Sequence, residues 1–99
     1  MMERLSEEQI EKELEKLPKW KRLDEKWIQR RYKFENYLMG IEFVSKVAAY
    51  AEGKEHHPNI AIDYKVVTLK ISSWKMQGLT DLDFEMVHHF DELYEQSDK

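Results

Sequence analysis

The amino-acid sequence predicts an α+β protein: a four-stranded antiparallel sheet with three helices on one face, in the order α-β-β-α-β-β-α. Two observations predict this class. Apolar residues recur at helical spacing in three stretches, each preceded by a residue that can cap a helix. Between these stretches, two pairs of strand-like segments are joined by short polar turns, which is typical of hairpins. Because each helix has an apolar face that must be covered, one sheet with the helices layered on it is favoured.

The first helix is predicted to begin directly after Ser6. The Ser6 side chain can accept a hydrogen bond from a free amide of the first turn, and Gln9, three residues later, can bond back to the cap. Leu5 and Ile10 flank this turn and can form a hydrophobic staple. Pro18 then ends the helix. The apolar stripe of this helix consists of Ile10, Leu14 and Leu17.

Two strands are predicted next, over residues 20–23 and 27–34, with a polar turn at residues 24–26 between them. The second strand alternates apolar and polar side chains, as expected for a strand with one buried face. A hairpin is therefore predicted. Its apolar side carries Ile28, Tyr32 and Phe34, and its polar side carries Gln29, Arg31 and Lys33.

A longer helix is predicted over residues 37–52. Asn36 is positioned to cap its first turn, and Gly53 is expected to end it. Apolar residues recur along this helix on a face that is broader than contact with one sheet requires. This breadth indicates a homo-oligomer. The face consists of Leu38, Ile41, Val44, Val47, Ala48 and Ala51.

The chain after Pro58 is predicted to return to the sheet and then to form the last helix. Residues 63–65 can turn, and residues 67–72 alternate apolar and polar side chains. Thr80 is expected to cap the last helix, with Asp83 at the third position as its capping partner. The buried stripe of this helix is expected to consist of Leu82, Met86, Val87, Phe90 and Leu93.

Composition limits the number of domains and the classes of partner. A chain of 99 residues is long enough for one hydrophobic core, so residues 1–99 are expected to form a single domain. The formal net charge of −4 gives no electrostatic reason to expect nucleic acid as a ligand. No apolar run could cross a membrane and no signal-peptide pattern is present, so no membrane association is expected. The absence of cysteine suits a cytoplasmic protein and excludes thiolate metal sites.

Two adjacent histidines, His56 and His57, lie between a predicted helix and a predicted strand. Histidine suits proton transfer near neutral pH because both of its protonation states are populated there. Adjacent side chains of an extended segment point in opposite directions, so one histidine can face a pocket and the other a wall. Two other interpretations stay open: a solvated surface loop, and a metal site that includes Glu55 and Asp63. Adjacent histidines seldom both reach one ion, which weighs against the metal.

The residues around the histidine pair follow a spaced pattern. After Glu52 come three residues, then His56-His57-Pro58, then five residues to Tyr64, nine more to Trp74 and eight more to Asp83. In these residues and spacings the chain resembles the pterin-4a-carbinolamine dehydratase family. The resemblance continues at residues 5–8, 34–37 and 78–80, and it spans residues 5–93.

The resemblance implies a reaction and a site. The reaction is the dehydration of 4a-hydroxytetrahydropterin to quinonoid dihydropterin, in recycling of a tetrahydrobiopterin-type cofactor. His56 and His57 would be the catalytic histidines, one in proton transfer with the 4a-hydroxyl and the other holding the pterin. No metal and no cofactor would be needed, and the partner would be the small-molecule pterin. The substrate-binding positions implied by the resemblance are Glu52, Glu55, Ser72, Ser73, Trp74 and Asp83.

Trp74 departs from the family pattern, in which a third histidine is expected. An indole N–H is only a donor and cannot shuttle a proton, although the ring can stack on a flat pterin. Weakened rather than absent catalysis is therefore expected. Each binding position also has a plainer interpretation: Asp83 could serve only as the capping partner of Thr80, and Glu52 could be a solvated residue near a helix end.

Two other functions stay open at this stage. Animal relatives also resemble a dimerisation cofactor for a homeodomain transcription factor, so the chain could be a non-catalytic binding or dimerisation module. It could also be a degenerate paralogue that binds another flat heterocycle. The dimers and tetramers of the family imply a homodimer or homotetramer in either case.

Overall fold

The computed structural model describes residues 3–97, and its elements follow the predicted order. The four strands form one antiparallel sheet, so the predicted α+β class is confirmed. A short 3₁₀ helix, η1, precedes the last helix. The elements are α1 (Glu7–Glu15), β1 (Lys21–Arg22), β2 (Ile28–Lys33), α2 (Tyr37–Lys54), β3 (Asn59–Asp63), β4 (Val66–Ile71), η1 (Trp74–Met76) and α3 (Asp81–Gln96).

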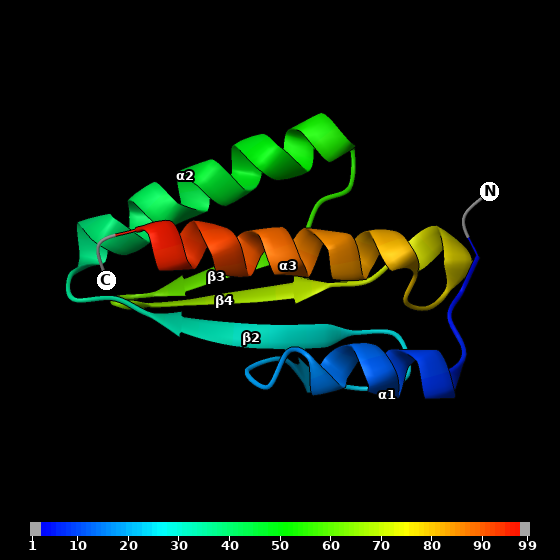
Figure 1. The fold of residues 1–99 in the computed structure, drawn as a ribbon. Coiled ribbons are helices and arrows are strands. Elements are labelled where there is room, and N and C mark those ends of the chain that lie inside the picture. Colours follow the sequence, from blue (N-terminus) through cyan, green and yellow to red (C-terminus); the bar gives the residue numbers. More distant parts are fainter. Residues whose placement is uncertain (1–2, 98–99) are drawn as a thin grey trace.

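The sheet has the strand order β1-β2-β4-β3, with β2 and β4 at its centre. In this central pair Ile28 lies opposite Ile71 and Tyr32 lies opposite Val67, and all four side chains are fully buried. The intervening Arg31 is exposed on the other face. The predicted alternation therefore gives one covered face and one bare face. Figure 1 shows α3 running along the sheet with α2 on one side of it and α1 on the other.

Asp91 of α3 fixes this helix to the sheet and to the segment after α1. Its carboxylate accepts hydrogen bonds from the Trp20 indole N–H (3.1 Å) and the Tyr32 hydroxyl (2.6 Å), and it pairs with Arg30 at 2.8 Å. Burial raises the pKa of Tyr32 well above its ordinary value, and the nearby Asp91 charge raises it further. The phenol therefore stays a neutral donor to Asp91.

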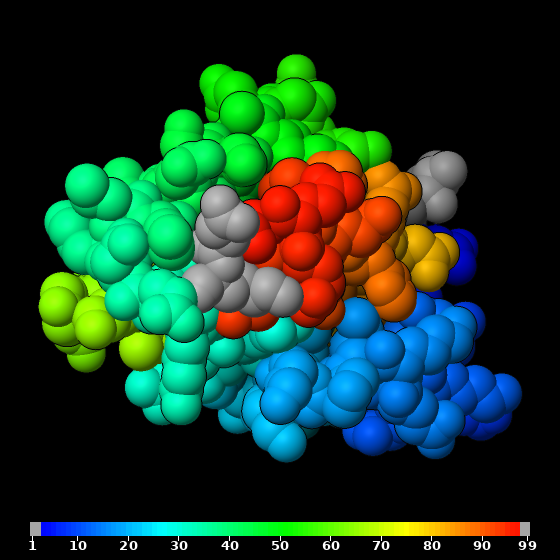
Figure 2. Space-filling view, turned by 60° about the vertical axis from the view of Figure 1, so that its left-hand side comes forward, coloured from blue at the N-terminus to red at the C-terminus, as the bar shows by residue number. Residues whose placement is uncertain are grey.

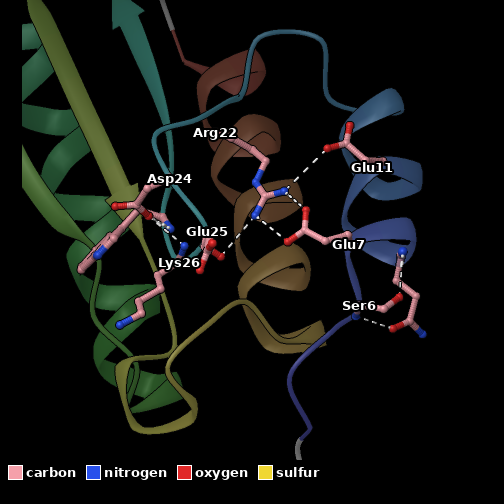
Figure 3. A network of polar contacts seen from close by, with 9 residues as sticks. Ser6, Glu7, Glu11, Arg22, Asp24, Glu25 and Lys26 are labelled. Carbon is pink, nitrogen blue, oxygen red and sulfur yellow. Dashed lines mark hydrogen bonds and ion pairs between the residues drawn. The ribbon is translucent and has the colours of Figure 1, made fainter.

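The predicted capping box of α1 is confirmed. The Ser6 hydroxyl accepts from the Gln9 amide at 3.2 Å, and the Gln9 side chain accepts from the Ser6 amide at 2.8 Å. Arg22 then ties α1 to the first hairpin, because its guanidinium pairs with Glu7 and donates to the Glu25 carbonyl at 3.2 Å (Figure 3). Exposed ion pairs of this kind add little stability, so their effect is mainly to orient α1.

The end of α2 differs from the prediction. Asn36 caps the helix by accepting from the Met39 amide at 3.0 Å, as predicted, but Gly53 does not end it. The helix continues to Lys54, and Glu55 takes the left-handed conformation with φ 54°. In this conformation the Glu55 amide donates to the Glu52 carbonyl at 3.1 Å. A non-glycine residue in this region stores strain of about 1–3 kcal/mol, and such strain is concentrated at functional sites.

The buried stripe of α2 is narrower than the predicted apolar face. It consists of Gly40, Phe43, Val47 and Ala51, whereas Leu38 is 72% exposed and Ala48 is exposed as well. The helix therefore contacts the rest of the chain with only part of its apolar surface. Figure 2 shows the start of α2 (cyan) beside the β3–β4 turn (yellow-green).

Within residues 3–97 no helix is both long and apolar enough to span a membrane.

Candidate active site

A cleft of about 330 Å³ opens between the end of α2 and the connection from β4 to α3. One side of its lining comes from residues 54–56 and the other from residues 73–76, and Leu82 completes it. Four residues singled out from the sequence line this cleft together. They are Glu55, His56, Ser73 and Trp74.

His56 is held by a buried carboxylate. Its Nε2 lies 2.7 Å from Oδ1 of Asp83, a side chain with no solvent exposure. The second oxygen of Asp83 accepts from the Thr80 amide at 2.9 Å and from the Ser73 hydroxyl at 2.8 Å. The Ser73 and Thr80 hydroxyls also lie 2.9 Å apart. Four residues from three segments thus form one buried polar network at the edge of the cleft.

The network determines which nitrogen of His56 carries the proton. An ionised carboxylate only accepts hydrogen bonds, and the donors around Asp83 are those that a buried carboxylate requires. The 2.7 Å contact therefore makes Nε2 of His56 the donor. In the neutral imidazole the lone pair is then on Nδ1. Nδ1 forms no hydrogen bond with the protein in the part of the chain that the structure describes, so it is available to a ligand.

The local backbone explains how these side chains meet. The left-handed Glu55 turns the chain sharply out of α2 and directs His56 toward α3. After β4, Ser73 and Gly78 pair as an isolated bridge, with the Ser73 amide donating to the Gly78 carbonyl at 3.0 Å. This bridge closes a small loop that contains η1. It brings Trp74 to the cleft while turning the Ser73 hydroxyl toward Asp83.

The capping interpretation of Asp83 is confirmed, but it is only part of what this residue does. Asp83 forms the capping box with Thr80 at the start of α3, and the same carboxylate binds His56. The two roles therefore coexist in one carboxylate and do not compete. The contact between Thr80 and Ser73 could not be predicted from the sequence, although both are small hydroxyl residues beside the motif.

His57, Glu52 and Ser72 lie outside the residues that line the cleft. His57 Nε2 is 2.7 Å from the Glu52 carboxylate, and the two side chains are 61% and 79% exposed. Ser72, the first residue after β4, is buried. The two adjacent histidines thus point to different surroundings, as the extended segment predicted. Trp74, in contrast, lines the cleft and is 72% exposed, so its flat face is open to a ligand.

The metal interpretation finds no arrangement to support it. Among the described residues, no group of three histidine, aspartate or glutamate side chains is positioned to hold a metal ion. The ring nitrogen of His56 that faces Asp83 is already engaged. The site is therefore best described by its hydrogen bonds and its shape.

Comparison with known proteins agrees with the spaced pattern around this cleft. The family model described as pterin 4 alpha carbinolamine dehydratase matches residues 3–93. This chain belongs to that family. A protein of Picosynechococcus named "Putative pterin-4-alpha-carbinolamine dehydratase" is 41% identical, covering 94% of this chain and all of the relative. A protein of the same name from Aquifex aeolicus is 31% identical over 97% of this chain and 96% of its own length.

Two solved structures resemble this member of the pterin-4a-carbinolamine dehydratase family in fold. The crystal structure of a transcriptional coactivator/pterin dehydratase from Brucella melitensis matches with a TM-score of 0.87 and 28% identity, covering 92% of this chain and 98% of that one. A pterin dehydratase-like protein described as a RuBisCO assembly factor in the alpha-carboxysome matches with a TM-score of 0.65 and 19% identity, covering 76% and 88%. At that identity the second match demonstrates a common fold alone.

Proposed function

We propose that this protein catalyses the dehydration of a 4a-hydroxytetrahydropterin to quinonoid dihydropterin and water. One observation carries the proposal: His56, oriented by the buried Asp83, lines a cleft of small-molecule size. Clefts of roughly 300–1,000 Å³ are typical of small-molecule sites. Membership of the pterin-4a-carbinolamine dehydratase family supports the choice of a pterin as the molecule that occupies it.

The residues of the cleft suit a flat bicyclic ligand. The exposed face of Trp74 offers a surface on which the pterin ring can stack. The carboxylate of Glu55 can accept hydrogen bonds from the amino group and ring N–H of the pyrimidine half. In this arrangement the ring junction, which carries the hydroxyl that leaves, faces His56.

The chemistry requires one proton to be delivered and one to be removed. Protonated His56 gives the proton on Nδ1 to the departing 4a-hydroxyl, while the electron pair on N5 forms the C4a=N5 bond and the C4a–O bond breaks. Water leaves, and the same Nδ1 then accepts the proton from N5, so His56 ends in its starting state. Asp83 keeps the Nε2 proton in place throughout and stabilises the imidazolium. No metal, nucleotide or covalent nucleophile enters the balance.

Acid–base assistance of this kind contributes about 10²–10⁴-fold to a rate. That range corresponds to roughly 2.7–5.4 kcal/mol of activation free energy. Trp74 occupies the position where the family pattern has a third histidine, so one proton-transferring group is replaced by a stacking surface. We therefore expect the rate enhancement from acid–base catalysis to lie in the lower part of that range.

The remaining site residues have supporting roles in this proposal. His57 and Glu52 hold the part of the pterin that extends past the end of α2, where their 2.7 Å pair is exposed. Ser72 contributes backbone groups at the end of β4. The protein works as a homodimer or homotetramer, and the exposed apolar residues Tyr37, Leu38 and Tyr64, which share one surface hollow, support self-association there.

Stopped-flow measurement on chemically generated 4a-carbinolamine tests the proposal. Acceleration over buffer is expected for the wild-type protein and its loss is expected for His56→Ala. A wild-type rate equal to that of buffer would rule out the enzymatic function. If His56→Ala retained full activity, the assigned proton-transfer residue would be wrong. A purely scaffolding module would instead keep its partner binding in His56→Ala.

A further inference from the structure

Two lysines line the same cleft as His56, and the proposed dehydration gives neither of them a role. Lys54 comes from the end of α2 and Lys75 from η1. They lie beside a single acidic lining residue, Glu55, in a chain whose formal net charge is −4. Lysines therefore outnumber acidic residues in the lining of this cleft, on a protein that is acidic as a whole. A neutral pterin ring can accept a hydrogen bond from an ammonium group but offers it no opposite charge.

The two lysines are not equivalent. Lys54 is already paired with Glu85, and that pairing raises the pKa of the Lys54 ammonium. Lys75 has no acidic partner among residues 3–97, and its ammonium lies 5.8 Å from the centre of the Trp74 ring. Lys75 is thus a free cation held over the aromatic surface that is available for stacking.

From this arrangement we infer that the cleft takes a pterin whose side chain carries an anionic group, a carboxylate or a phosphate, and that Lys75 binds that group. The inference rests on the proposed function and defines the class of its substrate. Lys54 adds a weaker attraction because Glu85 already neutralises it. Lys75 is accordingly a specificity-determining residue, and no proton passes through it.

The charges of the cleft match the two ends of such a ligand. Glu55 belongs to the α2 side of the lining and Lys75 to the η1 side. A pterin has its hydrogen-bond donors on the pyrimidine half and its side chain on the pyrazine half. A ring stacked on Trp74 can therefore direct its donors to Glu55 and its anionic side chain to Lys75. A neutral side chain would satisfy only the first of these contacts.

Direct binding measurements on stable oxidised pterins test the inference without requiring turnover. The anisotropy of pterin fluorescence would be followed at low ionic strength with 6-carboxypterin, which is anionic at its side chain, and with the neutral 6-hydroxymethylpterin. The wild-type protein is expected to bind the carboxylate about tenfold more tightly, as one charge-assisted contact allows. Added salt should reduce the preference, because the lysine is exposed to solvent.

Variants of two lysines separate a specific contact from a general charge effect. Lys75→Gln should abolish the preference and Lys75→Glu should reverse it. Lys70→Gln is the matched control: Lys70 also lies over an indole ring, that of Trp27 at 5.5 Å, but on β4 between the buried Leu69 and Ile71 and so on the bare face of the sheet. The Lys70→Gln variant removes the same charge and the same kind of contact, and it should leave the preference for 6-carboxypterin intact.

Three results would overturn the inference: equal affinity of the wild-type protein for both pterins, a preference that survives Lys75→Gln, or no binding of either pterin. The carbinolamine assay on a neutral substrate judges the dehydratase function separately. Turnover without any preference for the anionic pterin would refute the inference alone. A Lys75-dependent preference without turnover would refute the catalytic function alone.

Discussion

Asp83→Asn is the substitution that tests the geometry of the site most directly. In the wild-type protein one carboxylate oxygen faces Nε2 of His56 at 2.7 Å, and the other accepts from Thr80 and Ser73. An asparagine can keep its oxygen toward Thr80 and Ser73, which preserves the helix cap. Its amide N–H₂ then faces His56 and requires a lone pair on Nε2. The neutral imidazole must move its proton to Nδ1, so it presents the wrong tautomer to the substrate.

The expected loss of activity follows from what His56 supplies. If proton transfer through Nδ1 is prevented, kcat should fall by most of the contribution of acid–base catalysis, about 10²–10⁴-fold. KM should change little, because Asp83 is fully buried and lies outside the residues that line the cleft. The lost charge-assisted hydrogen bond should also lower the free energy of unfolding by about 1–3 kcal/mol.

The assay combines turnover with a direct view of the tautomer. Stopped-flow kinetics on the carbinolamine would give kcat, and ¹⁵N NMR of labelled histidines would report which ring nitrogen of His56 carries the proton. Asp91→Asn is a matched control in the same helix, since Asp91 is also a hydrogen-bonded carboxylate, although a part-buried one, and it contacts Trp20 and Tyr32 instead. It should lower stability without a comparable loss of kcat. A folded Asp83→Asn protein with kcat within twofold of wild type would refute the reasoning.

Three further predictions concern other parts of the molecule. Trp74→His should raise kcat, because it restores a proton-transferring group at the exposed position lining the cleft, and steady-state kinetics would detect it. The contribution of the neutral Tyr32 phenol to the free energy of unfolding should be fully present below pH about 10 and should be lost as the pH rises further. The reason is that the phenol of the unfolded chain ionises there, whereas burial raises the pKa of Tyr32 in the folded protein. In urea titrations across that pH range, the free energy of unfolding of Tyr32→Phe should fall less steeply with pH than that of the wild-type protein. Leu38→Glu should weaken self-association in sedimentation experiments with little change in the unfolding free energy, because Leu38 is 72% exposed.

Local sequence patterns were sufficient for most of the fold. The Ser6 and Asn36 caps, the alternation in β2 and the turn at residues 63–65 depend on hydrogen bonds and side-chain directions within a few residues. Such short-range preferences can be read directly from spacing. The end of α2 could not be read in this way. Gly53 stays helical and Glu55 adopts the left-handed conformation instead. The next residue, His56, is bound to Asp83, which is 27 residues away in the sequence.

The same distinction applies to the candidate site: the sequence indicates its residues, and the folded chain decides their contacts. The spaced motif in the sequence contains His56, Trp74 and Asp83, and the family resemblance adds Ser73. Neither could say which of these residues touch. Only the folded chain brings His56 within 2.7 Å of Asp83, 27 residues away, and puts Ser73 on the other oxygen of that carboxylate.

Likewise, the pairing of Lys54 with Glu85, which leaves Lys75 as the free cation of the cleft, joins residues 31 positions apart. The sequence therefore determined which chemical groups this protein has and in which elements they lie. The tertiary structure decided which of those groups share hydrogen bonds. The physical reason is that hydrogen bonds and ion pairs act over a few ångströms, and packing of the helices on the sheet determines which distant residues come that close.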